Sequence, residues 1–176
     1  MPAKNVLDTF VQFAYMTVPG AVAASGVALQ QLVTGITNMQ KVGWAVSRLE
    51  FYFNPQWMGE MTTPGDVISL GLTQSGSLTQ NLGPGGMSMI DQVILACGAM
   101  TALALPYDYH QQPVIHDFGQ NERLVLPQTL FMSLEWDVTG ALTVPGAGLR
   151  VFYKEYELSE KDWYDLLQLR LPLGAA

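Results

Sequence analysis

Charged side chains are scarce in this sequence, and basic side chains are the scarcest. Lys and Arg number 8, Asp and Glu number 15, and the 176-residue chain has a net charge of −7. A typical soluble domain has about a quarter of its residues charged, against 13% here. Clustered basic residues supply most of the affinity for phosphate backbones, so we expect no direct nucleic-acid binding. The basic residues are scattered: Lys4, Lys41, Arg48, Arg123, Arg150, Lys154, Lys161 and Arg170.

Residues that bind metals are also few. Cys97 is the only cysteine and lies in an apolar run, which excludes an internal disulfide and a cysteine-rich zinc site. We expect it to be a small buried hydrophobic residue rather than a reactive thiol. His110 and His116 are the only histidines, and they do not match the His-x-His pattern of a metal-binding cupin. We expect both to be polar residues at a turn; a structural metal shared with Asp108 or Asp117 is the alternative.

Patterns typical of catalysis are missing as well. There is no Gly-x-Ser-x-Gly elbow, and the glycine-rich segment 83–86 lacks the lysine that follows a phosphate-binding loop. Glu155 and Glu157 share one face of an expected strand, where a charged strand edge is a simpler explanation than a glycosidase pair. The sequence therefore predicts no enzyme, no cofactor and no metal.

The chain contains no long hydrophobic run. Residues 9–40 carry no charge, but glycine, proline and glutamine interrupt them repeatedly. A membrane-spanning helix needs about 20 predominantly apolar residues. We therefore expect strands and loops here, with no transmembrane segment, and no secretion signal at the N-terminus.

Turn residues, by contrast, are abundant and regularly spaced. Gly and Pro together number 27, and the runs between them are rich in Val, Thr, Phe, Tyr and Trp. Many short strands with regular turn signals favour a β-sandwich or barrel. We predict an all-β, single jelly-roll sandwich of about eight antiparallel strands, drawn from residues 9–17, 27–36, 44–53, 66–73, 102–109, 113–117, 123–127, 130–138 and 149–158.

Alternation of side chains supports three of these strands in particular. In residues 44–53, Ser47, Leu49, Phe51 and Phe53 fall on one face, and Arg48, Glu50 and Tyr52 on the other. Residues 130–138 alternate in the same way. Residues 149–158 carry aromatic side chains on both faces, which predicts protein on both sides of that strand.

Two segments have helical signals. Residues 88–97 begin with Ser88 and continue into an apolar run, which predicts a short internal helix. Residues 160–169 have Ser159 as a cap, Asp162 to complete it, and an apolar stripe that includes Trp163 and Leu167. We expect one domain: an N-terminal arm and first strand over 1–24, a barrel over 25–158, and a C-terminal helix and tail over 159–176.

A weakly charged surface suits contact with other subunits, and aromatic residues commonly anchor such contacts. A carbohydrate-binding platform on the loops is the alternative use of the same rings. The candidate subunit-interface residues are Phe10, Phe13, Tyr15, Trp57, Tyr107, Tyr109, Trp163 and Leu167.

The C-terminal part of the chain resembles a family of viral proteins. Ile115-His116-Asp117 and the segment from Glu122 to Pro127 precede strand 130–138, strand 149–158 and the helical sequence 159–164. This order resembles the last strands and C-terminal helix of small single jelly-roll (vertical β-barrel) major capsid proteins. These form tailless icosahedral viruses with an internal membrane, the sphaerolipovirus-like group.

That resemblance implies a structural virion protein. Such a subunit assembles with copies of itself or with a second capsid protein into an icosahedral shell over an internal membrane. The expected location is the virion, assembled in the host cytoplasm. The alternative is a jelly-roll binding module, such as a spike or a receptor- or carbohydrate-binding protein.

Overall fold

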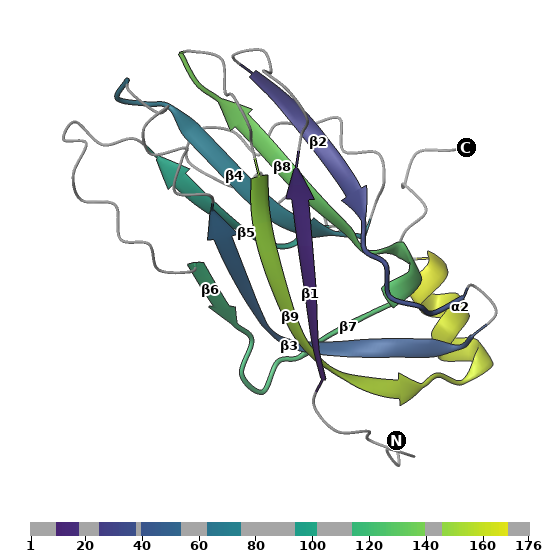
Figure 1. Cartoon of the computed structure of the whole chain (residues 1–176). Helices are drawn as coiled ribbons and strands as arrows, with labels where there is room; N and C mark the ends of the chain where they lie inside the picture. The colour runs from purple at the N-terminus through teal and green to yellow at the C-terminus, as the bar shows by residue number, and fades with distance from the viewer. Residues whose placement is uncertain are drawn as a thin grey trace.

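The chain forms two antiparallel β-sheets that face each other, with one α-helix beside them (Figure 1). The computed structural model describes residues 10–17, 25–37, 40–53, 63–74, 94–101, 114–139 and 146–168. Within these residues the secondary structure is predominantly β, which confirms the all-β expectation.

Sheet A has the strand order β1-β9-β3-β6, and β7 also pairs with β3. Sheet B has the order β2-β8-β4-β5. The strands of sheet A are β1 (Phe10–Thr17), β9 (Gly146–Glu157), β3 (Val42–Phe53), β6 (Val114–Asp117) and β7 (Arg123–Val125). The strands of sheet B are β2 (Ser25–Gln31), β8 (Phe131–Asp137), β4 (Val67–Thr73) and β5 (Ile94–Thr101).

The strands pair in a nested order. The first strand, β1, pairs with the last, β9, and β2 pairs with β8. Inside these pairs, β3 pairs with β6 and β7, and β4 pairs with β5. Every one of these pairs is antiparallel, so distant parts of the sequence lie side by side in both sheets.

The core lies between the two sheets because their strands alternate apolar and polar residues. Trp44 on β3 is fully buried and stacks on Tyr153 of β9, with ring centroids 3.6 Å apart. On sheet B, Gly26 leaves room for the indole of Trp136, which a Cβ at that position would overlap. The other large buried side chains come from both sheets: Leu49, Phe51, Ile68, Leu70, Leu72, Leu126, Leu130, Met132 and Leu134.

Strand β3 contains an irregularity that changes which residues face the core. Val46 pairs with Tyr153 but Arg48 pairs with Phe152, so Ser47 is an extra residue in the ladder. Such a bulge shifts the alternation by one position. As a result Val46 is buried before it and Leu49 after it, which strict alternation would not allow.

Most expected strands coincide with observed ones to within three residues at either end. Strand β2 ends at Gln31, five residues before the predicted end. The residues that follow turn at Gly35, which has a φ of +72°, a left-handed conformation that suits glycine. β7 also stops early, because Pro127 begins a 3₁₀ turn over Pro127–Thr129. The strand predicted over 102–109 lies outside the described residues.

The prediction of an internal helix over residues 88–97 is wrong where the structure describes it. Residues 94–97 belong to β5, in which Cys97 pairs with Gly71 of β4. A short apolar run is compatible with either a buried strand or a helix segment, and here pairing along β4 decides for the strand. Residues 88–93 lie outside the described part of the chain.

The C-terminal helix α2 spans Glu160–Gln168, as predicted up to the last described residue. The hydroxyl of Ser159 accepts the backbone N–H of Asp162 at 3.2 Å and donates to its carboxylate at 2.7 Å, as the capping pattern indicates. An exposed ion pair joins Lys41 to Glu160 at 3.1 Å. None of the helix residues is fully buried.

Replacing Ser159 with alanine is therefore expected to loosen α2 without disturbing the sandwich. Loss of an N-cap costs about 1 kcal/mol, and a nine-residue helix is marginal without its cap. Amide hydrogen exchange should show faster exchange in α2 and unchanged exchange in β3 and β9. A Ser159→Asp variant, which keeps a capping oxygen, should exchange like the parent chain.

Candidate functional site: the outer face of sheet A

The outer face of sheet A consists of the side chains of β1, β9, β3 and β6 that point away from sheet B. On β1 these are Val11, Phe13, Tyr15 and Thr17, and all four are exposed. Val11 and Phe13 are each 55% exposed and Tyr15 is 51% exposed. A solvated strand face normally carries polar residues, so this concentration of apolar surface makes the outer face of β1 the candidate contact surface.

Strand β1 is also at the edge of its sheet. Among the described residues it pairs only with β9, so no strand pairs with its other side. Natural proteins usually protect such an edge with charges, prolines or a covering element. β1 contains no charged residue and no proline.

Next to β1, two arginines hold a carboxylate on the same outer face. Glu50 of β3 forms ion pairs with Arg48 on its own strand and with Arg150 of β9, the latter at 3.7 Å. The hydroxyl of Tyr52 donates to Glu50 at 2.5 Å. These three side chains cover Glu50, so its side chain is only 7% exposed.

Both guanidinium groups also lie over aromatic rings. Arg48 is 5.4 Å from the ring centre of Phe152, and Arg150 is 5.0 Å from that of Tyr52. Such cation–π contacts fix the orientation of the arginine planes. Burial, followed by the hydrogen bond to Glu50, raises the pKa of Tyr52 above its ordinary value, so this phenol stays a proton donor.

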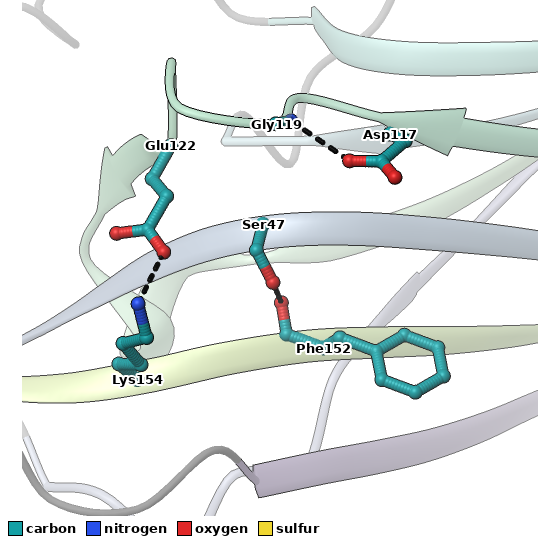
Figure 2. Close-up of polar contacts among 6 residues, drawn as sticks. All are labelled: Ser47, Asp117, Gly119, Glu122, Phe152 and Lys154. Atoms are coloured by element: carbon teal, nitrogen blue, oxygen red, sulfur yellow. Dashed lines mark hydrogen bonds and ion pairs between the residues drawn. The ribbon is translucent and has the colours of Figure 1, made fainter.

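Farther along the same face, Lys154 of β9 reaches Glu122 at 2.7 Å (Figure 2). The side chain of Lys154 passes over β3 at Ala45, its cross-strand partner, to reach Glu122. The small side chain of Ala45 leaves room for it. The hydrogen bond to Glu122 raises the pKa of Lys154.

The bulge in β3 and the turn between β6 and β7 fit against each other. The hydroxyl of Ser47 donates to the carbonyl oxygen of Phe152 at 3.3 Å, and the Ser47 carbonyl accepts the N–H of Phe118. Asp117 accepts the N–H of Gly119 at 2.8 Å, and Gly119 has a φ of +55° (Figure 2). This turn anchors the β6 edge of the outer face.

The outer face of sheet B is buried at its centre, although Val27 of β2 on the same face is 42% exposed. Ser69 and Thr73 of β4 and Ser133 and Glu135 of β8 alternate with core residues and so point away from sheet A, yet all four are buried. Within the described part of the chain, the hydroxyls of Ser69 and Ser133 have no hydrogen-bond partner. The two sheets therefore differ in the strands β1 and β4: the outward side chains of β1 are exposed, whereas Ser69 and Thr73 of β4 are buried.

The predicted interface residues fall into three groups. Phe13 and Tyr15 lie on the outer face, and Phe10, also exposed, packs beside Tyr153 with ring centroids 5.8 Å apart. Trp163 and Leu167 are half-buried on α2. Trp57, Tyr107 and Tyr109 lie outside the described residues. The structure thus brings Phe13 and Tyr15 together and places the α2 pair elsewhere.

Other residues singled out in the sequence have structural partners. His116 lies in strand β6, not in a turn, and meets the ring of Phe51 edge-on at 5.8 Å. Glu155 accepts the indole N–H of Trp44 at 3.1 Å. His110 lies outside the described residues. In the residues that are described, no three His, Cys, Asp or Glu side chains are grouped so as to hold a metal ion.

The Arg–Glu–Arg cluster was missed at the sequence level. The alternation of residues 44–53 and 149–158 placed Arg48, Glu50 and Tyr52 on one strand face and Arg150 on another. Only the register between β3 and β9, in which Glu50 pairs with Arg150, brings them together. An alternating series of cations and aromatic rings on two strands is the signal that could have suggested it.

In the described residues, no helix is long and apolar enough to cross a membrane. No known protein family matches the sequence, and no curated protein matches it either.

Proposed function

We propose that the two sheets form a single jelly roll. The nested pairing supports this assignment, because pairing the first strand with the last and continuing inward is the result of rolling up one long hairpin. If β6 and β7 are taken as one strand interrupted by the turn at Gly119, eight strands form two four-stranded sheets. Jelly rolls of eight strands occur in viral capsid proteins, lectins and cupins.

The function that fits this surface is that of a structural capsid subunit. It assembles with copies of itself, or with a second capsid protein, into the icosahedral shell of a virion, and it is put together in the host cytoplasm. The observation that carries the proposal is β1, an edge strand that no other described element covers and on which Val11, Phe13 and Tyr15 are exposed. Natural proteins seldom leave an apolar edge of this kind open to water, and cover by another chain is one way to protect it.

The scarcity of charge supports the same function. Many subunits packed side by side must avoid like-charge repulsion over large lateral contacts. A chain with 13% charged residues has fewer such conflicts than an ordinary soluble domain.

The guanidinium and aromatic groups around Glu50 favour a second candidate, a jelly-roll binding module. Exposed rings beside fixed hydrogen-bond donors are also suited to holding a carbohydrate or receptor. In that case β1 would serve as one wall of a ligand site, and the chain would act as a spike or receptor-binding protein.

Assembly can be tested directly with the purified chain. We expect sedimentation velocity and electron microscopy to show large, regular particles, either alone or on mixing with a second subunit from the same source. A Val11→Ser/Tyr15→Ser double variant should reduce the assembled fraction by about tenfold or more, because the two apolar contacts are lost at every interface of the assembly. Circular dichroism should show that the variant keeps its fold.

A matched control is Val27→Ser, since Val27 is 42% exposed on β2, on the outer face of sheet B. It should assemble like the parent chain. A chain that remains small at high concentration with every candidate partner, but binds glycans on an array, would instead favour the binding module.

A further inference from the structure

The outer face of sheet A has exposed apolar side chains at both of its edges. One edge is β1, with Phe13 and Tyr15 exposed. The opposite edge is β6, where Ile115 points outward as the partner of Glu50 and is 48% exposed. Charged and aromatic residues of β9 and β3 lie between these edges. Apolar edges on both sides of a polar centre match each other after a half-turn.

This face does not carry the negative charge of the chain. The outward side chains of its strands include three cations and two anions, so the net charge of the face is +1: Arg48, Arg150, Lys154, Glu50 and Asp117. The whole chain has a net charge of −7. The excess negative charge therefore lies elsewhere, and two identical acidic chains that meet on this face bring together its nearly neutral surface rather than their acidic surfaces.

We infer that the outer face of sheet A binds a second copy of this chain in a two-fold arrangement, with β1 of each copy over β6 of the other. This inference rests on the proposed assembly function and specifies one of its contacts. Phe13 and Tyr15 of one copy cover Ile115 of the other. Two-fold interfaces use the same patch on both subunits, so a self-complementary face is what they require.

The size of the face is sufficient for such a pair. The length of the face is that of a strand of about eight residues, such as β1, at about 3.3 Å per residue. Its width is that of four strands spaced about 4.8 Å apart, so the face covers roughly 500 Å² per copy. Two copies would bury about 1,000 Å², which is at the lower limit for a specific interface. The pair should therefore be reversible, with a dissociation constant of about micromolar order.

The experiment uses opposite charges at the two edges. Sedimentation equilibrium of the full chain should show a reversible dimer. Phe13→Glu and Ile115→Lys, each alone, should weaken dimerisation by about tenfold or more, since each places an unpaired charge in the contact. An equimolar mixture of the two variants should dimerise again, because Glu at position 13 of one copy faces Lys at position 115 of the other. Val27→Lys, on the outer face of sheet B, should dimerise like the parent chain.

Each other outcome overturns the inference. Dimerisation that neither charge change affects places the contact on another surface, while leaving the assembly function intact. Loss in both variants without recovery in the mixture excludes β1 over β6. A parent chain that is monomeric at every concentration excludes a second copy as the occupant, and particle formation with a second subunit then decides the proposed function separately. If Phe13→Glu fails to fold by circular dichroism, Phe13→Ser replaces it as the weakening variant.

Discussion

Replacing Trp44 with alanine is expected to lower the free energy of unfolding by about 4 kcal/mol. The indole is fully buried, stacks on Tyr153 at 3.6 Å and donates its N–H to Glu155 at 3.1 Å. Alanine removes the largest buried side chain of sheet A and leaves a cavity. It also leaves the carboxylate of Glu155 without the hydrogen bond from the indole. Urea denaturation followed by circular dichroism measures the loss.

Trp163→Ala provides a matched control, because it makes the same chemical change at a half-buried position on α2. We expect it to cost less than half as much stability. Equal losses at the two positions would mean that α2 packs into the core as tightly as β3 does, which is at odds with a helix that has no fully buried residue.

Replacing Glu50 with glutamine should destabilise the chain by about 2 kcal/mol. The change keeps the shape of the side chain but removes the charge that Arg48 and Arg150 share. Arginines beside a neutral amide repel each other and lose charge-assisted hydrogen bonds. Because the arginines are partly exposed, the effect should stay below that of breaking a fully buried ion pair.

A second measurement separates this electrostatic effect from a general loss of packing. Burial and, after it, the hydrogen bond to Glu50 raise the pKa of Tyr52. Removal of the negative charge should therefore bring the pKa of Tyr52 back toward its ordinary value, as ultraviolet titration can show. Glu160→Gln is the control, since its ion pair with Lys41 is exposed and should contribute about 0.5 kcal/mol or less. An unchanged titration of Tyr52 would contradict the role assigned to Glu50.

Alternation in the sequence was enough to identify most strands, because period-two patterning follows directly from strand geometry. Phe51 and Leu49 are buried and Arg48 and Tyr52 point outward, as the pattern predicts. The bulge at Ser47 could not be predicted, since nothing in the residues around it differs from a regular strand. It depends on the pairing of β3 with β9 and on the turn at Phe118.

Short apolar segments were the weakest part of the sequence-based prediction. The run that contains Cys97 fits a buried strand and a helix equally well, and only pairing with β4 distinguishes them. The capped helix at Ser159 was predicted correctly, since its signal is local: a hydroxyl, and a carboxylate three residues later.

The part of the candidate site that could be predicted from the sequence is the part visible within one segment of the chain. Phe13 and Tyr15 stand out because an apolar strand without charge is unusual at the sequence level. The burial of Glu50 depends instead on neighbours from its own strand and from β9, more than 90 residues away in the sequence. No pattern within one segment records such a contact.

The nested pairing has a consequence for the order of events in the cell. The outer face of sheet A is built from β1 and β9, which are separated by nearly the whole of the described sequence. A ribosome has to complete β9 before β1 gains its partner, and such distant pairing is slow to form. The outer face of sheet A is therefore complete only after the residues of β9 have been made. If this face is the contact surface proposed above, a partly synthesised chain does not present it, and only finished subunits enter an assembly.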